Sequence, residues 1–284
     1  MATAVVRDST VRSHYDSVDR VITAMRSHID QPLSLHEMAK VACASPFHFN
    51  RTFRHVTGVP PSQFLYALRL DAARRLLMQT ERKVIDICYD VGYNSVGTFT
   101  RRFTDLLGVS PSTFRDLARL PLMHRPEFPA PTLVSSGHLQ KSPKIFGRVY
   151  APVDFRGHVF VGLFRTPVPQ ARPVAGTIAD EHGFYRLDDV PEGEFYLFAL
   201  GLEETAPASA YFQYDSVLRA GGHLIAITRN SVHEAVNLSL RPPSPFDPPI
   251  LVVLALLIEE YFGRTEQVPP AVFPGPAMLA HAQG

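Results

Sequence analysis

Two stretches of this sequence share one pattern, and the rest of the fold can be built around them. The first reads SPFHFNRTF at residues 45–53, and the second reads SVGTFTRRF at residues 95–103. Aligned with an offset of 50, the copies also share a Gly, a Pro and a Phe downstream, at Gly58/Gly108, Pro61/Pro111 and Phe64/Phe114. This repeat predicts two copies of one helical unit, joined by a longer helix.

Local signals mark where the helices begin and end. Residues 34–37 read SLHE, which is a capping box with Ser at the N-cap and Glu three residues later. Residues 45–46 place a capping Ser before a Pro in the first helical position, and Gly58 is a natural residue just past a helix end. We therefore predict an all-α domain over residues 14–120, preceded by a disordered N-terminus at residues 1–13.

The sequence changes character in its second half. Five prolines among residues 121–143 predict a linker. Beyond it, apolar residues recur with period 2, as at residues 157–164, and turn signals separate about seven short runs. This spacing predicts an antiparallel β-sandwich over residues 144–262, followed by a disordered tail at residues 263–284. The expected fold class is multidomain α and β, with an all-α double helix-turn-helix domain followed by the sandwich.

The composition excludes several classes of protein. Two cysteines, Cys43 and Cys88, are too few for a disulfide or zinc framework, and the 12 histidines lack metal-ligand spacing. The longest apolar run, residues 250–258, is far shorter than the roughly 20 residues of a membrane span, and there is no signal peptide. No phosphate-binding glycine loop, nucleophile elbow or HExxH helix is present. We predict a soluble, cytoplasmic protein that is not an enzyme and needs no cofactor or metal.

Charge is unevenly divided along the chain. Residues 1–120 carry 16 Lys and Arg against 11 Asp and Glu, a net charge of +5. The remainder carries 12 against 16, a net charge of −4. Only the first half is therefore expected to meet a polyanion.

The second helix of each repeated unit needs one face for the core and another for a partner. The expected buried stripes are Phe49, Phe53 and Val56 in the first copy, and Phe99, Phe103 and Leu106 in the second. The residues left facing outward are Phe47, Asn50, Arg51 and Arg54 in the first copy, and Val96, Gly97, Thr100 and Arg101 in the second. Arg can hold two acceptors of guanine, Asn can bind adenine in the same way, and an apolar side chain can touch a thymine methyl. Gly permits close backbone approach.

With these positions the chain resembles the DNA-binding domain of the AraC/XylS family. The resemblance runs from about residue 16 to 118 and is carried by residues 32–35, 45–53, Gly58, Pro61, 68–70, 86–87, 91–93, 97–103, Gly108 and 110–111. It implies two helix-turn-helix units bound to successive major-groove segments on one face of double-stranded DNA. The commonest family arrangement puts the DNA-binding unit after a sensor domain, whereas here it comes first.

The resemblance also implies roles for the outward residues. Those that would read bases are Phe47, Asn50, Arg51 and Arg54 from the first unit, and Val96, Gly97, Thr100 and Arg101 from the second. Thr98 and Arg102 would hold phosphates, which position a protein without specifying sequence, and Ser95 is counted with the DNA-binding residues. Simpler roles stay open, because Arg51 and Arg101 could be solvated, Arg101 could pair with Asp105 and Val96 could pack. Both cysteines are expected to be small buried hydrophobes.

A second resemblance covers the β region. Residues 147–149, 157–163, 180–187, 190–193 and 196–197 look like a transthyretin-like (prealbumin-like, carboxypeptidase-regulatory) sandwich. That fold hosts many roles and assigns none by itself. The aromatic residues of its strands, Phe184, Tyr185, Phe195, Tyr196 and Phe198, are expected to form core rather than a ligand pocket.

Two functional hypotheses follow. The first is a sequence-specific transcription regulator whose sandwich senses a small-molecule effector, forms a homodimer or contacts a protein, with RNA polymerase a further candidate partner. The alternative is a non-enzymatic adaptor or scaffold whose sandwich recruits a protein partner to DNA. A ligand-dependent thermal shift favours the first hypothesis, and a co-purifying protein favours the second.

Overall fold

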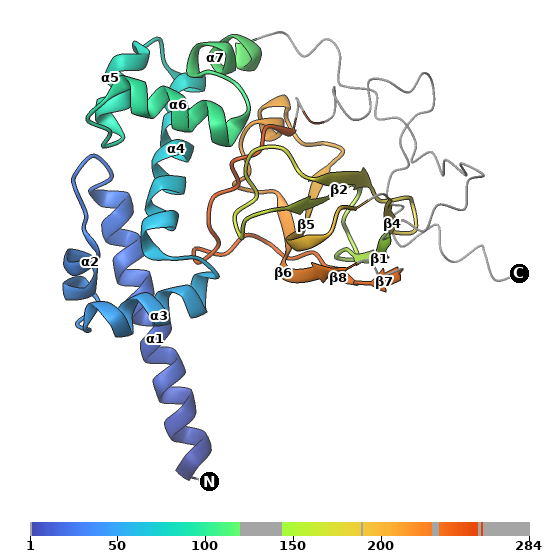
Figure 1. The fold of residues 1–284 in the computed structure, drawn as a ribbon, viewed down its shortest axis with the longest axis horizontal. Helices are drawn as coiled ribbons and strands as arrows, with labels where there is room; N and C mark the ends of the chain where they lie inside the picture. The colour runs from blue at the N-terminus through green and yellow to red at the C-terminus, as the bar shows by residue number, and fades with distance from the viewer. Residues whose placement is uncertain (1, 120–143, 189, 229–232, 255–256, 258–284) are drawn as a thin grey trace, which may run out of the picture. The chain divides into compact units, whose positions relative to one another are not determined.

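The computed structural model describes residues 2–119, 144–188, 190–228, 233–254 and 257 (Figure 1). The chain forms two compact units. Of the described residues, 2–119 and 244–251 form the helical unit, and those in the ranges 144–243 and 252–257 form the β unit. The predicted linker at residues 121–143 and the predicted tail at residues 263–284 lie outside the described residues.

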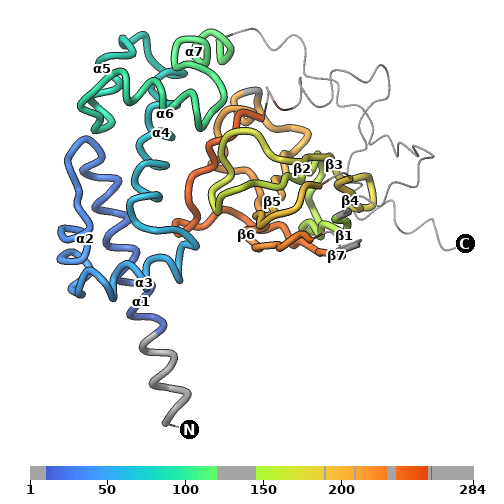
Figure 2. Tube along the Cα trace, in the orientation of Figure 1, coloured from blue at the N-terminus to red at the C-terminus, as the bar shows by residue number. Residues whose placement is uncertain are grey.

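The described part of the helical unit contains seven helices, which Figure 2 traces in order. They are α1 (Ala2–Ser27), α2 (Leu35–Val41), α3 (Pro46–Thr57), α4 (Pro61–Gln79), α5 (Val84–Asp90), α6 (Val96–Leu107) and α7 (Pro111–Arg119). The long helix α4 runs from the group formed by α1, α2 and α3 to the group formed by α5, α6 and α7 (Figure 1). The helical character predicted for this region is confirmed.

The predicted helix ends are present at the atomic level. The Ser34 N–H donates to the Glu37 carboxylate at 2.6 Å, and the Glu37 N–H donates to Ser34 Oγ at 3.3 Å. These hydrogen bonds, the one from the Ser34 backbone first, lower the pKa of Glu37 because they favour its charged form. Gly58 ends α3 with a φ of +79°, and Gly108 ends α6 with a φ of +87°. Glycine adopts this left-handed conformation without a Cβ penalty.

The N-terminus differs from the expectation. Residues 1–13 are predicted to be disordered, but helix α1 begins at Ala2. Residues 2–27 contain neither Pro nor Gly, so nothing in them stops a helix that starts from the buried positions Val18 and Val21. The lack of an apolar stripe at the start of the chain therefore does not prevent helix formation.

The two copies of the repeat have the same aromatic core. Its members are Phe49, Phe53 and Phe64 in the first copy and Phe99, Phe103 and Phe114 in the second, all at most 1% exposed. The Phe53 ring centroid lies 5.5 Å from those of Phe49 and Phe64. The Phe103 centroid lies 5.7 Å from those of Phe99 and Phe114. Inclined ring pairs of this kind contribute about 0.5–1.5 kcal/mol beyond area burial, so the repeated sequence produces repeated packing.

A segment far along the chain completes the helical unit. Residues 244–251 cluster with the helices, although the sequence analysis places them inside the sandwich at residues 144–262. The Phe246 ring lies 5.2 Å from the Tyr15 ring of α1 in an edge-to-face arrangement. Leu251 is fully buried, so this segment supplies apolar surface as well as polar contacts.

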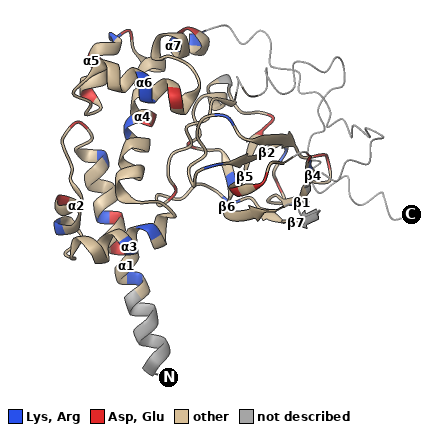
Figure 3. Ribbon diagram, in the orientation of Figure 1, with Lys and Arg blue, Asp and Glu red and all other residues tan. Residues whose placement is uncertain are grey.

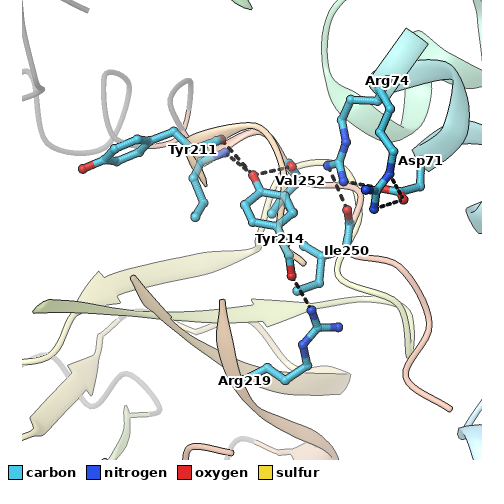
Figure 4. Close-up of polar contacts among 9 residues, drawn as sticks. Asp71, Arg74, Tyr211, Tyr214, Arg219, Ile250 and Val252 are labelled. Carbon is cyan, nitrogen blue, oxygen red and sulfur yellow. Dashed lines mark hydrogen bonds and ion pairs between the residues drawn. The ribbon is translucent and has the colours of Figure 1, made fainter. Parts of the chain in front are cut away.

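A buried ion pair anchors this segment to α4. Arg74 is 1% exposed and pairs with Asp71 one turn earlier on the helix. Its Nη1 donates to the Ile250 carbonyl at 3.0 Å (Figure 4). Asp71 also accepts from Arg75 at 2.8 Å. A buried charge requires this kind of pairing, because an unpaired guanidinium out of water is strongly destabilising.

The described part of the β unit contains eight strands and one short 3₁₀ helix. They are β1 (Lys144–Tyr150), β2 (Gly157–Phe164), β3 (Ala175–Ile178), β4 (Phe184–Leu187), β5 (Gly193–Glu203), η1 (Ala208–Tyr211), β6 (Leu218–Ile227), β7 (His233–Ala235) and β8 (Leu238–Ser239). One sheet has the order β3-β2-β5-β6 and is antiparallel throughout. The other has the order β4-β1-β7, with β8 also paired to β1.

The second sheet departs from the predicted antiparallel pattern. Strand β1 is antiparallel to β4 but parallel to β7 and β8. Alternating apolar residues reveal which face of a strand is buried, but they do not report the direction of its neighbour. The prediction of antiparallel strands is therefore confirmed for one sheet and wrong for the β7 and β8 edge of the other.

One buried cluster takes side chains from both sheets. Ile145 and Leu187 contribute from one sheet, and Val159, Leu163 and Leu197 from the other. The predicted alternation at residues 157–164 thus corresponds to a real core face. Among the described helices, none combines the length and apolar character needed to cross a membrane.

Candidate nucleic-acid interface

Helix α3 has a buried face and an exposed face. Its buried residues are Phe49, Thr52, Phe53 and Thr57. The predicted DNA-binding residues Phe47, Asn50, Arg51 and Arg54 are all exposed. Phe47 is 81% exposed, which is unusual for a large aromatic side chain. The face therefore combines two cations, an amide and an aromatic ring in contact with solvent.

The helix begins in a way that fixes this face. Ser45 is the N-cap, and its Oγ accepts a hydrogen bond from the His48 N–H at 3.4 Å. Pro46 occupies the first helical position, where its missing N–H has no cost. The positive end of the helix dipole and Phe47 consequently lie at the same end of α3.

Helix α6 repeats the arrangement. Phe99, Phe103 and Leu107 are buried. Of the predicted DNA-binding residues, those exposed are Ser95, Gly97, Thr98, Arg101 and Arg102, and those half-buried are Val96 and Thr100. Figure 3 shows Lys and Arg on α3, α4 and α6. The first set of predicted residues lies on α3, and the second lies on α6 and its N-cap, Ser95.

The buried stripes are shifted by one residue from the prediction at their ends. Val56 and Leu106 are only half-buried, whereas Thr57 and Leu107 are buried. Thr57 is accommodated because its hydroxyl donates to the Phe53 carbonyl at 2.8 Å. Because Thr57 is polar, the spacing of apolar residues does not predict that it is buried.

Gly97 leaves the backbone of α6 open on the exposed side. A Cβ built at this position meets only Ser95 Oγ, at 3.9 Å. No packing requirement within the protein therefore explains glycine here. The exposed backbone at Gly97 is accessible from solvent, because glycine places no side chain over it.

The arginines of α6 have different surroundings. Arg101 Nε lies 3.7 Å from Asp105 Oδ2, but both side chains are exposed, so this pair contributes little. The Arg102 guanidinium lies over the Tyr66 ring of α4, 5.2 Å from its centroid. It also lies close enough to the Tyr93 hydroxyl to affect its pKa, which desolvation by burial raises and Arg102 partly offsets. Arg101 is thus the more available of the two cations.

Arg69 holds the turn before α2, a role that the sequence analysis does not assign to it. Its Nε donates to the Ile29 carbonyl at 3.0 Å, and its Nη2 donates to the Gln31 carbonyl at 2.7 Å. A Cβ at Gly92 would lie 2.5 Å from the same Ile29 oxygen, and the φ of Gly92 is +81°. Arg69 and Gly92 therefore form the junction between the two repeated halves, and long-range contacts of this kind have no local sequence signal.

The cysteines differ from one another. Cys88 is buried as expected, and burial raises the pKa of its thiol. Cys43 is exposed, so the prediction of a buried side chain is wrong there. It follows the end of α2 in a left-handed conformation, with a φ of +54°, which turns its side chain away from the core. Among the described residues, no cluster of His, Cys, Asp and Glu could hold a metal ion.

The comparisons with known proteins concern the helical unit. A family model described as a helix-turn-helix domain matches residues 38–116. The regulatory protein SoxS of Salmonella typhimurium is 36% identical over 103 residues, which cover 36% of this chain and 96% of SoxS. The HTH-type transcriptional regulator ArgR of Pseudomonas aeruginosa is 31% identical over 107 residues, 38% of this chain and only 32% of ArgR.

Solved structures give matches over the same share of the chain. An AraC-type regulator from Chromobacterium violaceum is 26% identical, with a TM-score of 0.36, and the match covers 38% of this chain and 96% of that one. The DNA-binding domain of AdpA, solved with a target DNA, is 28% identical with a TM-score of 0.35, covering 36% and 92%. The match to SoxS, which is 36% identical and covered over 96% of its length, leads to one conclusion. The chain belongs to the AraC/XylS family of DNA-binding transcriptional regulators.

Proposed function

We propose that this protein reads two successive major-groove segments of double-stranded DNA, one with α3 and one with α6. The observation that carries the proposal is the exposure of Phe47, Asn50, Arg51 and Arg54 on α3 opposite a fully buried stripe. Within the part of the chain that the structure describes, the side chains of Arg51 and Arg54 form no ion pair and no hydrogen bond. Helix α6 supports the proposal because it exposes Gly97 and Arg101 on the corresponding face.

Each exposed group has a chemical role in this proposal. Arg51, Arg54 and Arg101 hold guanine acceptors, and Asn50 holds adenine. Phe47 and the exposed part of Val96 contact thymine methyl groups, while Gly97 and Thr100 allow close approach. The phosphate contacts come from Thr98 and from Ser95 at the N-terminus of α6. Arg102 joins them if it leaves the Tyr66 ring.

The β unit serves as the regulatory module in this proposal. Its two sheets around one buried cluster support the interpretation of a β-sandwich. Such a module can sense a small-molecule effector, form a homodimer or contact another protein such as RNA polymerase. The alternative function is an adaptor, in which the same unit recruits a protein to DNA and no small molecule changes the affinity for DNA.

DNA selection from a random pool with the full chain tests the proposal. We expect an asymmetric motif with two elements about 10 base pairs apart, one helical turn of DNA. Arg51→Ala and Arg101→Ala should each cost about 1–3 kcal/mol on the selected site and relax the preference at one base position. Arg26→Ala removes an exposed charge from the last turn of α1, which is part of neither proposed recognition helix, and should leave the motif unchanged.

Two results would count against specific readout. Enrichment of no motif would leave only non-specific binding. Equal losses for all three variants on every sequence would mean that Arg51 and Arg101 act as general cations rather than as base contacts.

A further inference from the structure

The outer face of the β3-β2-β5-β6 sheet is apolar, although it faces away from the cluster shared with the other sheet. Phe160, Gly162 and Phe164 of β2 alternate with the core residues Val161 and Leu163. On β5, Phe198 pairs with Gly162 and Leu200 pairs with Phe160 across the ladder. An antiparallel sheet with one face in water is normally polar on that face. This face therefore has a cover or a ligand.

Residues after the helical segment provide part of that cover. Val252 is 1% exposed and Leu254 is 2% exposed. Tyr214 anchors them, because its hydroxyl lies 2.8 Å from the Val252 carbonyl oxygen and accepts a hydrogen bond from the Leu254 N–H at 2.9 Å (Figure 4). Arg219 in turn donates to the Tyr214 carbonyl at 2.7 Å. The covering segment is thus held by specific polar contacts at its start.

The cover leaves a cavity of about 40 Å³ against the sheet. Its lining includes Phe160, Phe164, Phe198, Val252, Leu254 and Leu257 and is almost entirely apolar. A water molecule needs about 10–15 Å³ of such space and two to four polar partners. The cavity therefore has room for roughly three waters but lacks the partners to hold them. An apolar molecule the size of one aromatic ring matches this space better.

Two glycines create the space. Gly162 of β2 and Gly176 of β3 are opposite one another in the ladder. The Phe164 ring lies over Gly162, since a Cβ there would be 2.9 Å from Phe164 Cε2. A Cβ at Gly176 would have only ordinary contacts, at 3.6 Å from Pro173 Cγ and from the Val161 carbonyl. The absence of a side chain at Gly176 therefore keeps the cavity open without being needed for packing.

We propose that this cavity binds a small apolar molecule with a single aromatic ring. The Phe164 and Phe198 rings already form an edge-to-face pair with centroids 5.8 Å apart, and a third ring can join in the same geometry. Phe198, which the strand pattern places in the core, lines this site. This site would give the β unit the ligand that its proposed sensor role requires. Binding of the ligand does not depend on the proposed function, whereas an effect of the ligand on DNA binding does.

The regulatory consequence follows from chain continuity. Val252 lines the cavity, and Ile250, two residues earlier, belongs to the helical unit and accepts the hydrogen bond from the buried Arg74. A ligand that displaces or orders Val252 acts on a backbone that is already fixed at Ile250. Binding therefore changes the affinity for DNA to the extent that the ligand binds more tightly to the chain in its DNA-binding conformation than in its free one, or less tightly.

Toluene is a suitable probe for the full chain, with glycerol as a polar probe of similar size. We expect saturable binding of one toluene per chain by calorimetry and none of glycerol. Gly176→Leu fills the cavity and should weaken toluene binding at least about tenfold, or 1.4 kcal/mol. Leu224→Ala is the matched control, because Leu224 is a 54% exposed apolar residue on β6 of the same sheet and its loss should have no effect. Circular dichroism confirms that each variant is folded.

The outcomes separate this inference from the proposed function. Absence of toluene binding, or binding that Gly176→Leu does not weaken, overturns the ligand site even if the chain selects a DNA motif. If Gly176→Leu fails to fold, Leu257→Ala provides the second variant and must weaken binding. Toluene should also change the Kd for the selected DNA, and an unchanged Kd in saturating toluene overturns the regulatory consequence. Failure of DNA selection with toluene binding intact refutes the proposed function and leaves the site.

Discussion

Replacing Gly97 by Ala should stabilise the protein and weaken its binding to DNA. Gly97 is the second residue of α6 and is exposed. Its Cβ would meet only Ser95 Oγ at 3.9 Å, so a methyl group fits without strain in the free protein. The two expected effects have opposite signs, and a general loss of folding cannot produce that combination.

The magnitudes follow from the surroundings of the residue. Glycine inside a helix costs about 0.5–1 kcal/mol relative to Ala, and the first turn should give the lower end. The Tm should rise by about 1–4 °C. In a tightly packed interface, an added methyl costs about 1–3 kcal/mol, which weakens DNA binding about 5- to 150-fold.

Thermal unfolding by circular dichroism and fluorescence anisotropy on the selected DNA site measure the two effects. Gly108→Ala is the matched control, because its Cβ also meets nothing within 4 Å but its φ is +87°. We expect that variant to lose about 1 kcal/mol of stability and to keep its affinity for DNA. An unchanged or improved affinity of Gly97→Ala would refute close approach at this position, and a lowered Tm would refute the conformational argument.

Three further predictions concern single contacts. Because the pKa of Glu37 is lowered in the folded protein, its contribution to stability is complete above its ordinary pKa of 4.5 and is lost as the pH falls through the lowered pKa. In urea unfolding measured over this pH range, Ser34→Ala should reduce the dependence of the free energy of unfolding on pH. Asp71→Asn leaves Arg74 buried without a carboxylate and should cost about 3–5 kcal/mol in urea unfolding, whereas Asp105→Asn in the exposed pair should stay within about 0.5 kcal/mol. Phe47→Ala should leave the Tm unchanged because the ring is 81% exposed, and it should weaken binding to the selected DNA. If both the Tm and the affinity for DNA are unchanged, Phe47 does not contact DNA.

Local signals predicted much of the helical unit. Ser34, Glu37 and Gly58 specify helix ends through contacts within a few residues, and the structure contains all of them. The exposed faces of α3 and α6 follow from the spacing of large apolar residues. These features depend on neighbours along the chain, which a sequence displays directly.

Features that depend on distant residues could not be predicted. Asp71 and Arg74 are three residues apart on a helix, a pattern typical of a solvated pair, and nothing near them in the sequence indicates that Arg74 is buried and bound to the distant Ile250 carbonyl. The parallel pairing of β1 with β7 could not be predicted either, because the alternation of apolar and polar residues does not depend on the direction of the neighbouring strand. The cavity against β2 and β3 required two facing glycines and a covering segment from beyond residue 251, none of which has a local signature.

The anchoring of Ile250 to Arg74 also affects how the chain is synthesised. The two residues are 176 positions apart, and ribosomes add about 5–20 residues per second. Roughly 10–35 s therefore pass between the appearance of Arg74 and that of its carbonyl partner. During that interval the guanidinium of Arg74 lacks its carbonyl partner and stays exposed to water. The strands of the β unit are synthesised in the same interval, before the helices reach their final state. A nascent chain therefore cannot finish its DNA-binding part until almost all of its β unit has been made.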